Sequence, residues 1–309
     1  MPYGPLLDSV LNSTGLVNRA QFLFSVSLII ILYLLFTQTI RSKTASRNLN
    51  CVIRELALSN FQKEISVSNN ENIDLIIIIV AKNEENTIGM VIDKIHSLSL
   101  PLTYKIIVIN DGSTDKTQQI AESKGALIVS HFYNLGIGAV IKTGFIAAKL
   151  LKPKIIINID GDGQHDPKYI PEIISKLKDS NADLVYASRF TKDSNYKTTM
   201  VRSFGNRFYT RIINKIGKIS LTDVTSGYRG IRFDKLDSIF FVAESNFAIE
   251  LALRAGRADL KIMEITAFAE TRDFGLSQFH KIERFFLYNF NAISQIFNAL
   301  FRKPETYPV

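Results

Sequence analysis

Short runs of consecutive apolar residues, many of them β-branched, recur along the chain. They cover residues 75–80, 105–109, 126–129 and 155–157. Runs of this length and composition are typical of strands that are buried on both faces. The stretches between them, such as 87–98, carry apolar residues at helical spacing. This alternation predicts an α/β fold with a mainly parallel sheet and flanking helices.

A longer apolar stretch precedes these runs. No charged residue occurs from residue 20 to residue 40, a length that matches the ~20 residues an α-helix needs to cross a bilayer. Arg41, Lys43 and Arg47 follow the stretch, whereas only Arg19 precedes it closely, so the positive-inside rule places the rest of the chain in the cytoplasm. A cleaved signal peptide is the alternative, but the stretch starts late and no small-residue cleavage site follows it. We therefore predict a single-pass membrane protein.

These patterns divide the chain into five parts. We expect a short non-cytoplasmic segment (1–19), a transmembrane helix (20–40), a polar linker (41–72), one globular domain (73–280) and a C-terminal amphipathic helix with a tail (281–309). The C-terminal helix fits either the bilayer interface or a protein surface, because one wide apolar stripe runs along it. The stripe consists of Ile282, Phe286, Phe290, Ile293, Phe297 and Leu300.

Composition bears on the partners of the protein. A chain of 309 residues, 46% of them hydrophobic, is long enough to bury one substantial core. Its net charge of +8 suits nucleic acid, anionic lipid or a phosphorylated substrate, and no nucleic-acid motif favours the first. The lone Cys51 cannot form an internal disulfide, and no Cys/His spacing resembles a zinc site.

The most informative polar residues directly follow the last apolar run. Asp160 and Asp162 emerge on one glycine-rich turn at its end. Paired carboxylates of this kind suit Mg²⁺ or Mn²⁺ that holds a diphosphate. A calcium loop of the EF-hand type would need Gly and Glu where this chain has His165 and Pro171. Helix capping is a further alternative, which explains Asp166 well and Asp160 poorly.

Three more polar loops follow predicted elements, at residues 81–86, 110–115 and 134–139. The carboxyl ends of parallel strands share one edge of the sheet, where α/β proteins bind their ligands. Each loop alone would also suit a helix cap or a turn. The first loop contains no glycine, which argues against a dinucleotide-binding fold, and no P-loop motif occurs. Their common edge predicts one composite site.

Together these loops resemble the motifs of the family-2 glycosyltransferases of the GT-A fold, particularly the dolichyl- and polyprenyl-phosphate sugar synthases. The resemblance covers about residues 73–280. Besides the loops, it rests on A-S-R at 187–189, D-V-T-S-G-Y-R at 223–229, the Glu of F-A-I-E-L at 247–251 and R-D-F-G-L-S at 272–277. The chain departs from the family pattern at five positions: Val80, Lys82, Asn110, Gly161 and Gln278 replace the usual Pro, Tyr, Asp, Ala and Lys.

The resemblance implies an inverting, metal-dependent glycosyltransferase. It would move a hexose from a nucleotide diphosphate sugar, of the GDP-mannose or UDP-glucose type, to dolichyl or polyprenyl phosphate. The metal, Mg²⁺ or Mn²⁺, would be held by Asp160, Asp162 and Gln164. The implied nucleotide-sugar ligands are Ala81, Asn83, Glu84, Asp111, Gly136, Lys142, Asp160, Gly161 and Asp162. The implied acceptor-phosphate ligands are Arg189, Arg202, Arg229, Arg272 and Ser277. The implied catalytic residues are Asp162, Glu250 and Arg272.

The acceptor class can also be argued from chemistry. A sugar hydroxyl normally needs a carboxylate base, whereas a lipid monophosphate is already anionic and needs positioning cations. A hydroxyl acceptor, with Glu250 or another carboxylate as the base, is the enzymatic alternative. A catalytically silent scaffold is a remote one, because D-x-D-x-Q is intact.

The chain has basic residues and no acidic ones from 196 to 221. Arg207, Arg211 and Lys215 recur there at every fourth position, beside an apolar line. This pattern is typical of a basic helix that lies on a membrane. A solvated basic face over an ordinary core helix is the alternative. The apolar line consists of Phe204, Phe208, Ile212 and Ile216.

Overall fold

The computed structural model describes residues 9, 13, 19–67, 72–191, 200–241, 247–268, 296–297 and 299–303, of which 19–21, 43 and 200–205 are described by their backbone alone. The chain divides into two compact units, 1–52 and 53–309.

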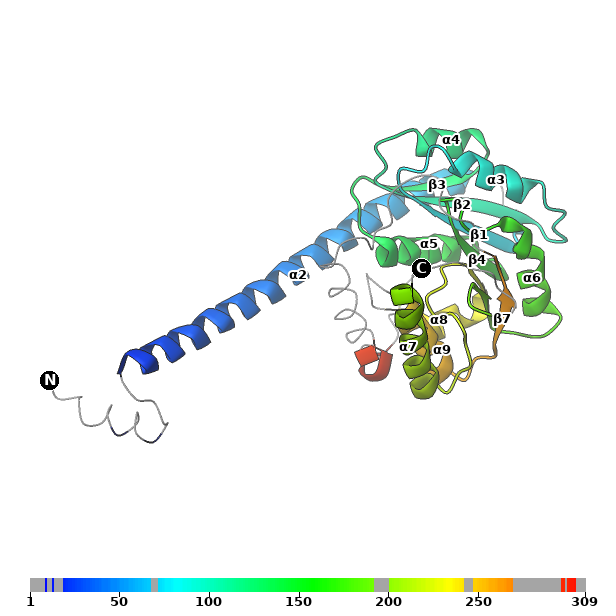
Figure 1. The fold of residues 1–309 in the computed structure, drawn as a ribbon. Helices are drawn as coiled ribbons and strands as arrows, with labels where there is room; N and C mark the ends of the chain where they lie inside the picture. The colour runs from blue at the N-terminus through cyan, green and yellow to red at the C-terminus, as the bar shows by residue number, and fades with distance from the viewer. Residues whose placement is uncertain are drawn as a thin grey trace. The chain divides into compact units, whose positions relative to one another are not determined.

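The second unit is built on a seven-stranded sheet with the strand order β3-β2-β1-β4-β6-β5-β7 (Figure 1). All strand pairs are parallel except those of β6, which runs antiparallel to β4 and β5. The prediction of a mainly parallel sheet is confirmed. The strands are β1 (Leu75–Ala81), β2 (Tyr104–Asp111), β3 (Leu127–His131), β4 (Ile155–Asp160), β5 (Leu184–Ser188), β6 (Arg229–Arg232) and β7 (Ile262–Thr266).

Helices cover both faces of the sheet, which explains why its central strands are apolar at every position. Alternate residues of β1 enter opposite cores: Ile76 and Ile78 pack on the α5 side, and Ile77 and Ile79 pack on the α3 side. The helices of this unit are α3 (Ile88–His96), α4 (Thr117–Ser123), α5 (Ile137–Leu151), α6 (Ile170–Lys178), α7 (Met200–Gly217), α8 (Leu236–Ile239) and α9 (Phe247–Arg257), with 3₁₀ turns η1 (Pro167–Tyr169) and η2 (Phe233–Lys235).

The long N-terminal helix α2 (Arg19–Val67) extends through most of the segment expected to be a linker. Within the second unit, Ile53, Ala57 and Phe61 are buried at successive helical turns. Ala57 and Phe61 belong to the same core cluster as Ile107 of β2 and residues of α5. Residues 53–61 are therefore part of the core of this unit.

In the first unit, α2 exposes its apolar side chains, including Ile29, Tyr33 and Phe36. Among the described residues, α2 is the one helix that is long and apolar enough to cross a bilayer, by its length and composition. This finding agrees with the span expected at residues 20–40.

Candidate active site

The turn that carries the two aspartates is fixed to the neighbouring strand. Asp160 ends β4, and the amide of Gly161 donates a hydrogen bond of 2.8 Å to the carbonyl of Val80 at the end of β1. A β-carbon at Gly161 would lie 3.0 Å from that carbonyl oxygen, so a side chain fits poorly there. The hydroxyl of Thr87 donates to the Gly161 carbonyl at 2.8 Å. These bonds hold the turn at the centre of the sheet edge.

The donor set on this turn suits a divalent cation that arrives with a diphosphate. Asp162 accepts a 3.0 Å hydrogen bond from the Gln164 amide, which orients its carboxylate. Within the described part of the chain, no three His, Cys, Asp or Glu side chains form a preformed metal site. Mg²⁺ commonly takes one or two carboxylates from the protein and completes its shell with phosphate oxygens and water. The residues present fit that mode of binding.

The loops that follow β1 and β2 are tied to each other. Asn83 accepts a hydrogen bond from the Thr114 amide at 2.8 Å, and its own amide donates to the Ser113 hydroxyl at 2.9 Å. The amide of Glu84 donates to the Thr117 hydroxyl at 2.8 Å. Two loops that are about thirty residues apart in sequence therefore form one wall, as their shared sheet edge predicts.

Asp111 is buried and fixes the start of α5. Its two carboxylate oxygens accept hydrogen bonds from the amides of Leu135 and Gly136, at 2.8 and 3.0 Å. One oxygen also lies 3.0 Å from Nδ1 of His131, whose Nε2 lies 3.0 Å from the hydroxyl of Thr143. Asp111 and Gly136, both expected to bind the nucleotide sugar, are thus brought into direct contact. His131 was missed by the sequence analysis, because a histidine at the end of an apolar run carries no spacing signal.

Ala81 and Lys142 are also buried near this edge. Ala81 is the last residue of β1 and is buried. Lys142 lies on α5 with its ammonium group 5.8 Å from the centroid of the Phe241 ring. A cation at this distance from a ring face is stabilised by the ring quadrupole.

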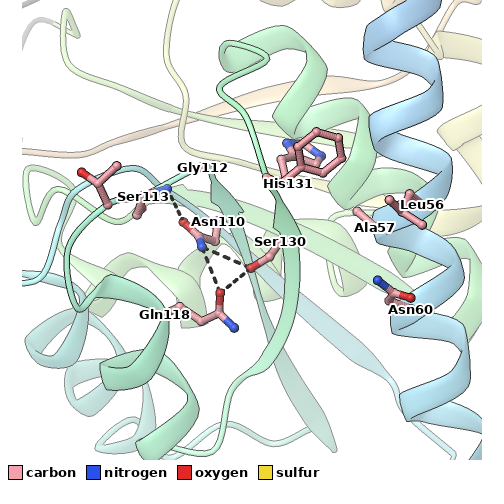
Figure 2. Close-up of a pocket in the computed structure, with 11 residues that line it drawn as sticks. Leu56, Ala57, Asn60, Asn110, Gly112, Ser113, Gln118, Ser130 and His131 are labelled. Atoms are coloured by element: carbon pink, nitrogen blue, oxygen red, sulfur yellow. Dashed lines mark hydrogen bonds between the residues drawn. The ribbon is translucent and has the colours of Figure 1, made fainter.

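A cavity of about 400 Å³ lies beside the same loops (Figure 2). A hydrogen-bonded amide and hydroxyl group line one side: Asn110 donates to Gln118 at 3.2 Å and to Ser130 at 3.1 Å, and Ser130 donates to Gln118 at 2.7 Å. Leu56, Ala57 and Asn60 of α2 line the other side. Asn110, which departs from the family pattern, therefore gives this wall a neutral amide.

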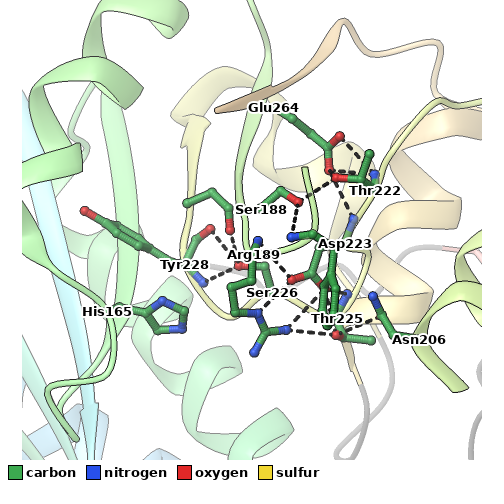
Figure 3. A network of polar contacts seen from close by, with 12 residues as sticks. His165, Ser188, Arg189, Asn206, Thr222, Asp223, Thr225, Ser226, Tyr228 and Glu264 are labelled. Carbon is green, nitrogen blue, oxygen red and sulfur yellow. Dashed lines mark hydrogen bonds and ion pairs between the residues drawn. The ribbon is translucent and has the colours of Figure 1, made fainter. Parts of the chain in front are cut away.

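The segments around Arg189 and Asp223 form a network of polar contacts (Figure 3). Arg189 binds Asp223 through Nε at 2.7 Å and Nη2 at 3.2 Å, and Nη2 also lies 3.1 Å from the Thr225 hydroxyl. Burial alone would raise the pKa of Asp223, but the Arg189 charge and the hydrogen bonds to the carboxylate hold that pKa below its usual value. The Thr225 hydroxyl also lies 3.2 Å from Oδ1 of Asn206 on α7. The guanidinium of Arg189 is therefore bound to protein groups, namely Asp223 and Thr225.

Glu264 on β7 extends this network, and it lies outside every motif in the sequence. Its carboxylate accepts hydrogen bonds from the amides of Thr222, at 2.8 Å, and Asp223, at 3.2 Å. Burial raises the pKa of Glu264. The hydroxyls of Ser188 and Thr222 lie 2.6 Å apart. The segment that begins at Thr222 is thereby fixed to both β5 and β7.

Arg229 is almost completely buried. Its guanidinium lies between two rings, 5.1 Å from the centroid of Tyr186 and 4.8 Å from that of Phe247, and it donates to the Ser226 carbonyl. Burial lowers the pKa of Arg229 and raises that of Tyr186 to about 12. Arg229 therefore stabilises the packing of the residues around it inside the fold.

His165 packs against the aspartate turn. Its Nε2 lies 3.5 Å from Oδ2 of Asp160, and its ring centroid is 5.4 Å from that of Tyr228. Burial lowers the pKa of His165 to about 4, and the positive charge of Arg189 adds to this effect. His165 is therefore neutral near pH 7.

Glu250 is buried in α9 and paired with Arg254. One carboxylate oxygen of Glu250 lies 2.8 Å from Nε and 2.7 Å from Nη2 of Arg254. Arg254 also donates to the backbone carbonyls of Arg302, at 3.1 Å, and Lys303, at 3.4 Å. This pair therefore connects α9 to the C-terminal residues.

Several predicted residues lie outside what the structure describes. They include Arg272, Ser277 and most of the C-terminal apolar stripe, and for Arg202 only the backbone is described. Of the stripe, Phe297 is exposed and Leu300 is half-buried, and their neighbour Ala299 packs into the core.

Several known proteins are similar to this chain. The model of "Glycosyl transferase family 2" matches residues 76–240, which is more than half of the chain. An uncharacterised protein of Methanocaldococcus jannaschii is 32% identical over 66% of this chain and 85% of its own length. The undecaprenyl-phosphate mannosyltransferase of Micrococcus luteus is 29% identical over 58% of this chain and 82% of its own length.

A solved structure shows the same fold. Glucosyl-3-phosphoglycerate synthase from Mycobacterium tuberculosis, in complex with Mg²⁺ and uridine diphosphate, is similar with a TM-score of 0.59. The similarity covers 78% of this chain and 83% of that chain, at 19% sequence identity.

Proposed function

Because this chain belongs to glycosyl transferase family 2, we propose that it transfers a hexose from a nucleotide diphosphate sugar to polyprenyl phosphate. The environment of Glu250 carries the choice of acceptor. A hydroxyl acceptor would need a base, and the carboxylate expected in that role is buried and paired with Arg254. A lipid phosphate needs no base, because its oxygen is already anionic. The similarity to an undecaprenyl-phosphate mannosyltransferase supports the same acceptor class.

Donor binding is proposed at the edge formed by the ends of β1, β2 and β4. Asp160 and Asp162, with Gln164, would hold Mg²⁺ or Mn²⁺, and the ion would neutralise the departing diphosphate. The structural neighbour with bound Mg²⁺ and uridine diphosphate supports this assignment. Ala81, Asn83 and the other predicted nucleotide-sugar residues would orient the nucleoside and sugar. In particular, Asp111 would act by fixing the start of α5, because both its oxygens are bonded to protein groups.

The residues predicted to bind the acceptor phosphate would have two different roles. Arg189 and Arg229 would position the segment 223–229, since one is paired with Asp223 and the other is buried. Arg202, Arg272 and Ser277 remain the proposed contacts to the acceptor phosphate. An oxygen of that phosphate would form a bond to the anomeric carbon while the bond to the nucleotide diphosphate breaks, with inversion.

For localisation, we propose that α2 crosses the membrane once and that the second unit faces the cytoplasm. The apolar stretch of α2 and the excess of Arg and Lys after it support this orientation.

The proposal is tested by incubating the purified full-length protein with radiolabelled GDP- and UDP-sugars and either polyprenyl phosphate or the dephosphorylated alcohol. We expect label from one donor to enter the lipid phase only with the phosphate, and only with Mg²⁺ or Mn²⁺ present. Equal use of the alcohol would show transfer to a hydroxyl and contradict the proposed acceptor.

A further inference from the structure

Helix α7 (Met200–Gly217) buries Ile213 in the core, but it also has two polar side chains on its inward side and two large apolar ones on its outward side. Its inward side includes Asn206 and Thr210, which are 8% and 6% exposed. Its outward side includes Phe208 and Ile216, which are 52% and 37% exposed. A helix whose outer face meets water normally places its aromatic and branched residues inward. The exposed pair requires a different explanation.

Basic side chains surround this exposed pair. Arg207, Arg211, Lys215 and Lys218 are all exposed. Among the described residues, none of these four side chains forms an ion pair with an acidic partner, and no acidic residue occurs from 196 to 221. The outer face of α7, defined here as Arg207, Phe208, Arg211, Lys215 and Ile216, is therefore both cationic and apolar.

We propose that the outer face of α7 docks on an anionic bilayer surface. Phe208 and Ile216 would enter the interface between head groups and acyl chains, and the three cations would contact lipid phosphates. A nucleic acid would match the charge but would leave Phe208 and Ile216 in water, whereas a bilayer satisfies both features. A chain with a candidate span would also keep this face at a high effective concentration of lipid.

The inner side of α7 explains what such docking would achieve. Asn206 accepts from the Thr225 hydroxyl at 3.2 Å, and Thr225 lies 3.1 Å from the Arg189 guanidinium. Docking would therefore hold the network around Asp223 within one helix diameter of the lipid head groups. The inference goes beyond the proposed function, because a bilayer contact of α7 does not depend on which acceptor is used.

The test uses the full-length protein in nanodiscs, with the exposed Cys51 replaced by Ser. Single cysteines at Phe208 and Ile216 carry an environment-sensitive fluorophore, and a cysteine at the exposed Gln119 on α4 is the control. We expect a blue-shifted emission and quenching by doxyl-labelled lipids at 208 and 216 in anionic nanodiscs, with neither effect at 119. Equal behaviour of all three positions would overturn the proposal. A blue shift without quenching would also overturn it, since a protein surface would then cover the face.

The contribution of charge is tested by a paired variant. Arg207→Glu with Arg211→Glu should lower the docking equilibrium constant by about fivefold or more for each cation removed. Lys152→Glu with Lys178→Glu, at exposed positions on other elements, makes the same change in net charge and should leave docking unchanged. Docking that is insensitive to the first pair, or as strong on neutral lipid, would contradict the anionic partner. Because the readout is depth in the bilayer, it remains informative even if no transfer to polyprenyl phosphate is found.

Discussion

Gly227 lies directly against the carboxylate of Asp160. A β-carbon built on Gly227 would be 2.9 Å from Oδ2 and 3.3 Å from Oδ1 of Asp160. The antiparallel pairing of β4 with β6 brings these residues together, and the Asn158 side chain donates to the Gly227 carbonyl. The segment 223–229, which is expected on the acceptor side, thus packs against the turn that is expected to hold the metal.

Gly227→Ala should therefore displace Asp160 and weaken metal binding by about tenfold or more, the size of effect seen when groups that orient metal ligands are changed. The backbone of Gly227 does not require a positive φ, so the fold should persist. The measurement is the Mn²⁺ dependence of transfer, together with Mn²⁺ binding to the purified protein. Gly217→Ala is the control, because the nearest atom to its β-carbon would be 3.5 Å away. Unchanged Mn²⁺ affinity in Gly227→Ala would contradict the metal assignment of Asp160.

Asp162→Asn should reduce turnover by on the order of 100-fold, because a carboxylate that would balance the charge of the metal is lost. Its hydrogen bond from the Gln164 amide can be kept by the new amide oxygen, so the unfolding temperature should change little. EDTA should reproduce the loss in the unchanged protein. Full transfer by a folded Asp162→Asn protein in EDTA would exclude a metal-dependent reaction.

Glu250→Gln separates a structural role from a catalytic one. The change removes the negative charge that is paired with the buried Arg254, so we expect a loss of about 3–5 kcal/mol of stability. Transfer to polyprenyl phosphate should remain measurable at temperatures where the variant is folded. Adding Arg254→Met should recover much of the stability, since an apolar side chain replaces the uncompensated charge. Abolished turnover in a folded Glu250→Gln protein would instead identify Glu250 as a base.

Phe61→Ala tests whether the end of α2 belongs to the core. Phe61 is 1% exposed, so its truncation should cost about 3–5 kcal/mol. Leu56→Ala, on the same helix but 50% exposed, should cost less than about 1 kcal/mol. Thermal unfolding of both variants in detergent provides the comparison. Similar unfolding temperatures would mean that residues 53–61 do not stabilise the second unit.

His165 should make stability depend on pH. Its pKa is lowered from 6.5 to about 4, so between these values the unfolded chain binds the proton and the folded protein does not. Stability should therefore decrease as the pH falls from about 6.5 to about 4, by on the order of 3 kcal/mol. Unfolding measured in EDTA should show this slope in the unchanged protein and in His96→Gln, an exposed control, but not in His165→Gln. An equal slope in His165→Gln would assign the effect to other groups.

The sequence by itself determined the central strands and the loops at their ends. A strand buried on both faces must be apolar at every position, so 75–80 and 155–157 predict β1 and β4 without any knowledge of their neighbours. The loop after each parallel strand reaches the same edge, which is why Asp160 at the end of β4 lies beside Val80 at the end of β1. These features depend on residues that are adjacent in the chain.

The tertiary structure alone decided which charged side chains are buried or paired with other protein groups. Arg189 and Asp223 pair across 34 residues, and Arg229 is buried between rings from β5 and α9. A motif shows that these residues are present but does not show whether a charge faces solvent or a partner. Likewise, Ile53, Ala57 and Phe61 recur once per helical turn in a segment expected to be a linker, and their burial became evident only when residues 53–61 were placed against β2 and α5. Each of these outcomes depends on contacts between distant segments, and local patterns do not encode them.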